Sequence, residues 1–210
     1  MKFVHFLLIL CLVALAASVG CADPTRDKPK AVVEEATPVP EPAAAARKFV
    51  LGEGSSVGFV GSKVTGSHEG GFHSFEGEIH VVDSDPTQSS VNLSIDTTSL
   101  WADNEKLTGH LKSADFFDVA TYPTAAFQST TIIPDGDHYR MVGNLTLHGI
   151  TKSVSFPAQI TVEDDQVTAE AEFSILRFEF EIEYKGMADD LIRDAVLIKL
   201  KLVGVPPTES

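Results

Sequence analysis

Apolar and polar residues alternate in short segments through most of residues 48–204. In residues 91–96, for example, Val91, Leu93 and Ile95 alternate with polar neighbours, so one face of the segment is apolar and the other is polar. This period of two is typical of an antiparallel strand that buries one face. The expected strands are residues 57–65, 75–81, 91–96, 125–132, 139–147, a strand that ends at Ile160, a strand that begins at Val167, residues 178–184 and residues 195–203.

The alternation is clearest in residues 178–184 (FEFEIEY). Three aromatic residues and Ile182 fall on one face, and three glutamates fall on the other. A helix would mix these residues around its circumference, because its period is 3.6 residues. The segment therefore predicts a half-buried antiparallel strand.

Turn-forming residues separate the segments at the expected places. Residues 135–137 (DGD) and 148–149 (HG) predict two hairpin turns, and residues 164–165 (DD) predict another turn. The set amounts to about eight antiparallel strands, which suits an up-and-down barrel or a sandwich. A closed barrel leaves no strand edge exposed, so we expect an all-β, lipocalin-like barrel.

A helical period interrupts the strands once. Asp103 is the expected helix N-cap, and Leu107 and Leu111 lie four residues apart on one helical face. Phe116 and Phe117 follow in an apolar group that a surface loop would not carry. We expect a short helical insertion across one end of the barrel, with Leu107, Leu111, Phe116 and Phe117 as a plug or a gate. The alternative is an amphipathic helix that only fills space.

Residues 1–20 have the pattern of a signal peptide, because their apolar run is too short to span a membrane. The run ends in residues 18–21 (SVGC), which resemble a bacterial lipoprotein signal whose Cys21 becomes the lipidated N-terminus. The chain has two cysteines, and Cys11 would leave with the signal. Lipidation of Cys21 would then also remove a lone thiol. The alternative is ordinary signal-peptidase cleavage after Ala22.

Residues 21–47 are rich in alanine, proline and glutamate and contain no aromatic residue. Such a segment has little to bury that would offset the entropy lost on ordering. We expect an extended tether of about 3.1 Å per residue, on the order of 80 Å in total. Residues 48–204 would form the single domain and residues 205–210 a tail. The protein would be exported and lipid-anchored at the periplasmic or outer-surface face of a bacterial membrane.

The formal net charge is −14 at pH 7. This acidity argues against nucleic-acid partners and against electrostatic docking on anionic lipids. The histidines are scattered and lack the H-x-H or H-E-x-x-H spacing of a metal site, and no G-x-S-x-G motif is present. We therefore expect a non-enzyme with no metal and no cofactor. If the protein did act on a lipid, His68, His110 and Arg177 would be the residues to test.

Three longer motifs carry a resemblance. They are residues 61–72 (GSKVTGSHEGGF), residues 107–119 (LTGHLKSADFFDV) followed by YPT, and residues 143–152 (GNLTLHGITK). In this order they resemble the YceI family of bacterial exported proteins, over roughly residues 49–203. The resemblance implies a lipocalin-like barrel whose interior holds a long amphiphilic lipid or a polyisoprenoid.

The ligand would be bound by apolar residues that point into the barrel. The candidates are Phe59, Phe75, Ile79, Leu93, Ile95, Phe127, Leu145, Phe173 and Phe180. The expected function is non-catalytic binding of this ligand, with the membrane as a second partner through the N-terminal lipid anchor. The alternative is an interaction or stress-response module that uses the barrel surface around a filled lumen. The oligomeric state is open, with a homodimer as one option.

Overall fold

The structure is a computed structural model that describes residues 23–188 and 190–208. The expected signal peptide and the expected lipidation site, Cys21, lie outside the described residues. Within the described part of the chain, no helix is long and apolar enough to cross a membrane.

The described residues form fourteen strands, one α-helix and two short 3-10 helices. In chain order these are β1 (Val32–Glu35), β2 (Arg47–Leu51), β3 (Ser56–Lys63), β4 (Gly66–Phe72), β5 (Phe75–Val82), β6 (Asp85–Asp96), η1 (Thr97–Ser99), β7 (Leu100–Ala102), α1 (Glu105–Lys112), β8 (Thr124–Asp135), β9 (His138–Leu147), β10 (Ile150–Val162), β11 (Val167–Leu176), η2 (Arg177–Phe180), β12 (Gly186–Met187), β13 (Asp190–Leu191) and β14 (Ala195–Val205).

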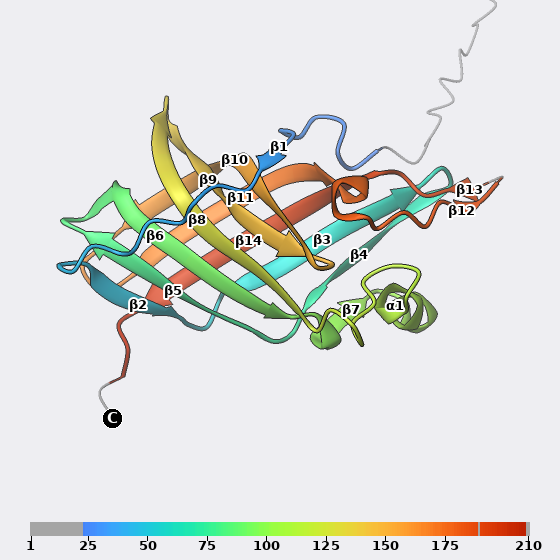
Figure 1. The fold of residues 1–210 in the computed structure, drawn as a ribbon, viewed down its shortest axis with the longest axis horizontal. Coiled ribbons are helices and arrows are strands. Elements are labelled where there is room, and N and C mark those ends of the chain that lie inside the picture. Colours follow the sequence, from blue (N-terminus) through green and yellow to red (C-terminus); the bar gives the residue numbers. More distant parts are fainter. Residues whose placement is uncertain (1–22, 189, 209–210) are drawn as a thin grey trace, which may run out of the picture.

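Eight of the described strands close into an antiparallel barrel, in the order β10-β9-β8-β6-β5-β2-β14-β11 and back to β10. Helix α1 lies beside one end of this barrel (Figure 1). The prediction of an all-β, eight-stranded barrel with a short helical insertion is therefore confirmed. Closure pairs most strands of the barrel on both sides, which leaves few free strand edges that could pair with other chains.

Strands β3, β4 and β7 extend the barrel wall on one side. β14 pairs with β2 only through its last residues, and residues 197–201 of β14 pair with β3 instead. β3 continues through β4 to β7, which leads directly into α1. The β3–β4 hairpin projects past the barrel on the same side as α1 (Figure 1), so it forms one wall of that end.

The predicted turns lie where the sequence placed them. His148 and Gly149 both have positive φ, 51° and 75°, and connect β9 to β10 as a two-residue hairpin. Gly136, with φ 68°, lies in the turn between β8 and β9. A further turn, at Asp83 and Ser84, also has positive φ and connects β5 to β6. Its sequence carries no glycine, so the pattern did not reveal it.

The predicted strand over residues 178–184 is wrong. Residues 177–180 form η2, and Glu181 has a left-handed backbone with φ 56°. The reason is the buried Arg177 guanidinium, which donates hydrogen bonds to the carbonyl oxygens of Ile182 and Tyr184. These carbonyls are satisfied by a side chain, so the segment needs no neighbouring strand.

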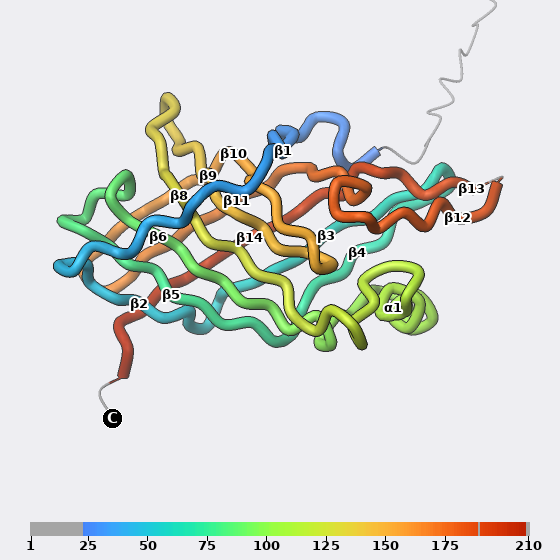
Figure 2. The backbone as a smooth tube through the Cα atoms, viewed as in Figure 1, coloured from blue at the N-terminus to red at the C-terminus, as the bar shows by residue number. Residues whose placement is uncertain are grey.

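The expected tether over residues 21–47 does not match the described part of this segment. β1 pairs with residues 152–155 of β10, and residues 23–46 run across the outside of the barrel (Figure 2). Ala31 and Val33 pack against the main core. The edge of β10 is free to accept β1, because β11 pairs with β10 only over residues 159–162.

Candidate functional site

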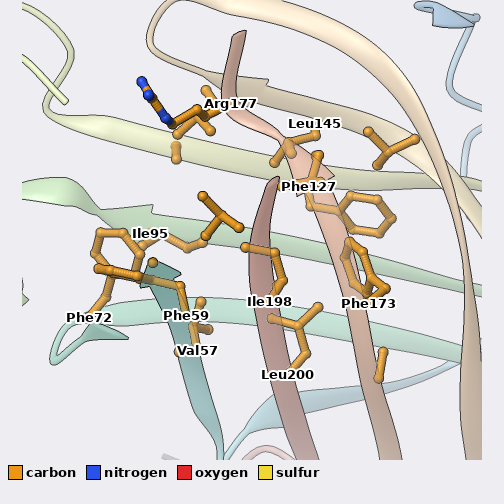
Figure 3. A pocket seen from close by; sticks show the side chains of 18 of the residues that line it. Val57, Phe59, Phe72, Ile95, Phe127, Leu145, Phe173, Arg177, Ile198 and Leu200 are labelled. Atoms are coloured by element: carbon orange, nitrogen blue, oxygen red, sulfur yellow. The ribbon is translucent and has the colours of Figure 1, made fainter. Parts of the chain in front are cut away.

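The barrel interior contains a cavity of about 370 Å³ that opens to the surface. Its walls are mainly apolar (Figure 3). Central lining residues include Val57, Phe59, Phe72, Leu93, Ile95, Phe127, Met141, Leu145, Phe156, Phe173, Ile198 and Leu200. A lumen filled by side chains would have excluded an internal ligand, and this lumen is not filled. A volume of a few hundred cubic ångströms is within the range of small-molecule pockets.

Small residues keep the lumen open. Ala125, Ala158, Ala169 and Ala171 line the cavity from three barrel strands. Where larger side chains are present, glycines on the wall receive their rings: a Cβ atom at Gly70 would collide with the Phe59 ring, and one at Gly143 would collide with the Phe127 ring. The rings can therefore lie flat against the wall, which leaves the centre of the barrel free.

Aromatic residues form one side of the cavity. The rings of Phe156 and Phe173 stack with centroids 4.0 Å apart and an interplanar angle of 9°. Phe127 packs against Phe156 with a centroid distance of 5.7 Å. Stacked rings of this kind give a rigid apolar surface with few rotamers to lose when a ligand binds.

The far end of the barrel is packed solid. Phe49, Ile79, Val81 and Val167 are nearly fully buried there and do not line the cavity. Phe49 and Ile79 are register partners on the neighbouring strands β2 and β5, so their side chains lie side by side on the inner face of the wall at that end. The cavity is therefore closed at the end where Phe49 lies, and its opening lies elsewhere.

Most of the predicted lining residues border the cavity. These are Phe59, Leu93, Ile95, Phe127, Leu145 and Phe173. Phe75, Ile79 and Phe180 do not: Phe75 lines a separate groove together with Leu51, Ile79 fills the closed end, and Phe180 is completely buried as the last residue of η2. That the six bordering residues contact a ligand stays a prediction.

All four predicted gate residues, Leu107, Leu111, Phe116 and Phe117, line the cavity. We call the part of the cavity that these four residues line its mouth, and their role there as a plug or a gate stays a prediction. Leu111 and Phe116 form a small cluster of buried residues with Leu100 and Ile182, separate from the main core. The helical insertion therefore has its own packing, which allows it to differ from the barrel in stability.

The helix cap differs from the prediction by one residue. Asn104 is the N-cap, and its side-chain oxygen accepts a hydrogen bond of 3.1 Å from the Leu107 amide. Asp103 instead continues the sheet, since its amide donates to the Glu69 carbonyl oxygen at 2.9 Å. Because both residues are good caps, the sequence alone could not separate them.

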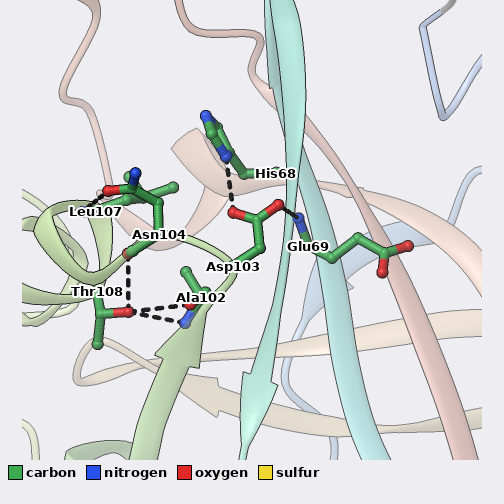
Figure 4. Close-up of polar contacts among 7 residues, drawn as sticks. All are labelled: His68, Glu69, Ala102, Asp103, Asn104, Leu107 and Thr108. Atoms are coloured by element: carbon green, nitrogen blue, oxygen red, sulfur yellow. Dashed lines mark hydrogen bonds and ion pairs between the residues drawn. The ribbon is translucent and has the colours of Figure 1, made fainter.

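The Asp103 carboxylate connects the start of the helical insertion to β4 (Figure 4). It is hydrogen-bonded to His68 Nδ1 at 2.7 Å and accepts from the Glu69 amide at 3.1 Å. Partial burial would raise the pKa of Asp103, but these hydrogen bonds outweigh it and lower the pKa below its usual value. Asp103 is thus ionised at neutral pH and holds one side of the mouth in place.

Other histidines and Arg177 also have structural partners. His110 Nε2 lies 2.8 Å from an Asp115 carboxylate oxygen, and His148 Nδ1 donates to the Phe180 carbonyl oxygen at 3.2 Å. Arg177 binds backbone carbonyls, as described above. Within residues 23–188 and 190–208, no group of three or more His, Cys, Asp or Glu is placed to hold a metal ion. These contacts favour structural roles over catalytic ones.

Several lining residues were missing from the sequence prediction. Met141, Val154, Phe156, Ile198 and Leu200 all face the cavity. Each lies in an alternating segment, so its inward orientation could be read from the period of two. The position of each residue along the barrel axis could not be predicted from the sequence, because it depends on the stagger of the strands.

Comparison with known proteins places this architecture in a family. Residues 50–204 match the model of the YceI-like domain. The protein YceI of Escherichia coli O157:H7 is 38% identical over 96 residues, which cover 46% of this chain and 50% of the relative. The chain thus aligns with about half the length of the curated relatives it matches.

Two solved structures share the fold. BcnA of Burkholderia cenocepacia has a TM-score of 0.62 and 27% identity, over 71% of this chain and 95% of the other. A polyisoprenoid-binding domain from Saccharophagus degradans has a TM-score of 0.63 and 16% identity, over 77% of this chain and 99% of the other. The family match spans most of the described barrel, so this chain belongs to the YceI-like domain family.

Proposed function

We propose that the protein binds a long amphiphilic lipid or a polyisoprenoid chain inside the barrel, without catalysing a reaction on it. The single observation that carries this proposal is an apolar cavity inside the barrel that opens to the surface and is lined by the predicted gate residues. A structural neighbour described as a polyisoprenoid-binding domain supports the choice of ligand class.

The size of the cavity is sufficient for useful affinity. At roughly 30 Å³ per group, 370 Å³ holds about twelve methylene-sized groups. At about 0.8 kcal/mol per buried methylene, their transfer from water supplies on the order of 10 kcal/mol before association costs are subtracted. A longer chain would extend past the mouth, where the polar head of an amphiphile would remain in water.

The cellular location and the membrane anchor are part of the same proposal. An exported protein anchored through Cys21 would hold this cavity close to a source of hydrophobic ligands at the periplasmic or outer-surface face of a membrane. The sequence pattern of residues 1–21 supports this setting. His68, His110 and Arg177, the residues that a lipid-modifying enzyme would be expected to use, have structural hydrogen-bond partners, which favours a carrier over an enzyme.

The test combines extraction with a variant that fills the lumen. Ala171 lines the cavity, whereas its exposed neighbour Glu172 faces outward and pairs with Lys28. Organic extraction and mass spectrometry of the wild-type protein should recover a recurring amphiphile in stoichiometric amount. Ala171→Phe should lose this ligand and lose affinity for a fluorescent farnesyl probe, because its ring occupies ligand space.

Glu172→Phe adds the same ring on the outer face and serves as the matched control, so it should retain the ligand. Melting temperatures verify that both variants are folded. Wild-type protein that is repeatedly empty, together with probe binding that Ala171→Phe leaves unchanged, would contradict the proposal. That result would favour a surface interaction module with a structural lumen.

A further inference from the structure

Three exposed apolar side chains gather at the tips of two neighbouring hairpins. Val64, Met187 and Leu191 are 58%, 70% and 49% exposed. Val64 follows β3, whereas Met187 and Leu191 belong to β12 and β13. The Val64 amide donates to the Leu191 carbonyl oxygen at 3.2 Å, so the hairpins are joined. We call Val64, Met187 and Leu191 the apolar tip.

The apolar tip lies directly beside the cavity. Lys63 and Ile192 line the cavity and form an isolated bridge with each other. Val64 follows Lys63 in the sequence and Leu191 precedes Ile192. Both of these side chains are exposed to solvent instead. Ile192 also packs against the cluster that contains Leu111 and Phe116. The wall of the cavity, the gate and the apolar tip are therefore continuous.

The charge at the apolar tip is partly neutralised. The Asp190 carboxylate, next to Leu191, forms an ion pair with Lys63 and accepts a hydrogen bond from Thr65 Oγ1 at 3.0 Å. The protein as a whole is acidic. Contact with a membrane through this patch would therefore depend on apolar burial and not on attraction to anionic lipids.

The described N-terminal end of the chain is attached at the same side. An Asp23 carboxylate oxygen lies 3.4 Å from Arg193 Nη1, and the Arg193 amide donates to the Ser62 carbonyl oxygen at 2.8 Å. Thr25 is buried against the barrel. Asp23 lies two positions after Cys21, so an anchor at Cys21 would be attached close to the apolar tip. This differs from a barrel suspended on a long tether.

We propose that the apolar tip inserts into the interface of a lipid bilayer and holds the cavity mouth against the membrane. The inference rests on the proposed function, because a membrane lipid is then the ligand that passes the gate. Three side chains give weak, reversible binding, and the anchor would supply the second signal that stable attachment needs.

The test uses the chain from residue 23 onward, which contains every described element, and vesicles of zwitterionic phosphatidylcholine. At high lipid concentration, flotation should recover a measurable fraction of this chain with the vesicles, and added salt should not release it. The triple variant Val64→Ser, Met187→Ser and Leu191→Ser should lower the partition constant by about tenfold or more, since its apolar area is removed.

A matched triple variant controls for general surface apolarity. Val32→Ser, Ile133→Ser and Leu176→Ser alter three exposed apolar residues away from the tips of these two hairpins, and flotation should be unchanged. The proposal would be overturned if the unsubstituted chain did not bind the vesicles, or if it floated only with anionic vesicles in low salt. It would also be overturned if the tip variant floated as well as the unsubstituted chain. A dimer that the tip variant converts to monomers would overturn it too, because the patch would then bind a second copy.

The amphiphile extracted from each variant separates this proposal from the proposed function. The substituted tip residues do not line the cavity, so a tip variant that keeps its ligand but leaves the vesicles supports both proposals. Wild-type protein that floats through the apolar tip with an empty lumen supports membrane docking and contradicts the carrier function.

Discussion

Single residues decide how much of the barrel interior is empty. Phe59 faces the lumen, and its register partner on β4 is Gly70. A Cβ atom at Gly70 would lie 2.7 Å from the Trp101 carbonyl oxygen and would also collide with the Phe59 ring. Gly70 therefore has a specific steric reason to be a glycine. Gly61 differs, because nothing lies within 4 Å of a Cβ atom added there.

Gly70→Ala should therefore destabilise the barrel and push the Phe59 ring into the lumen, whereas Gly61→Ala, which adds one methyl group to open space at the cavity wall, should leave stability unchanged. We expect the first substitution to lower the free energy of unfolding by about 1–3 kcal/mol, because backbone and ring must both shift. Urea unfolding measures this change, and titration with the fluorescent farnesyl probe measures the loss of affinity. Equal effects at the two glycines would contradict the steric explanation.

At the scale of elements, the insertion around α1 divides into a structural part and a part free to act as a gate. Phe116 is 5% exposed and packs against Tyr184, with a centroid distance of 5.1 Å. Phe117 is less buried, and its ring contacts Phe59 and Phe72 at centroid distances of 6.3 and 5.9 Å. Both line the cavity, but Phe117 meets residues of the lumen wall.

Phe116→Ala should cost about 3–5 kcal/mol of stability, because it leaves a hole in a buried cluster. Phe117→Ala should cost less and should raise the rate at which bound probe is released, because it removes a ring from the mouth. Stopped-flow release and urea unfolding of the two variants distinguish the roles. If Phe117→Ala changed stability alone, the gate assignment would fail and the insertion would be a plug.

At the scale of the whole molecule, carboxylates hold the elements around the mouth together. Asp103 binds β4 from the start of the helical insertion, and Asp190 binds β3 from β13. The hydrogen bond and charge of Lys63 lower the pKa of Asp190, and hydrogen bonds lower the pKa of Asp103 against the opposing effect of burial. The contacts that hold β4 and β3 beside the mouth therefore depend on two ionised carboxylates, those of Asp103 and Asp190.

Acidification should loosen this end of the molecule. Both pKa values are lower in the folded state, so the unfolded state binds more protons and stability falls with decreasing pH. The contribution is complete above the ordinary Asp pKa of about 3.9 and is lost as the pH falls through the folded values. Melting temperatures between pH 6 and pH 2 measure it. The double variant Asp103→Asn and Asp190→Asn should show a smaller decline over this range, and an unchanged decline would contradict the assignment.

Local pattern was sufficient to predict much of this molecule. The period of two predicted the strands and their inward faces, because alternation is a property of each strand alone. The turn at residues 148–149 and the helical period at Leu107 and Leu111 are equally local, and all were found in the structure. Together they determined an all-β barrel with a helical insertion.

Contacts between distant residues decided the rest. The alternation in residues 178–184 could not show that Arg177 would satisfy its carbonyls and replace a strand with η2. Ile79 faces inward as expected, yet it fills the closed end because β2 places Phe49 opposite it. Residues 23–35 are held on the barrel because β11 leaves part of the edge of β10 open, and β1 pairs there. The sequence by itself thus determined which residues point inward, and only the tertiary structure decided which of them pack together and which surround the cavity, because that depends on strand stagger and long-range pairing.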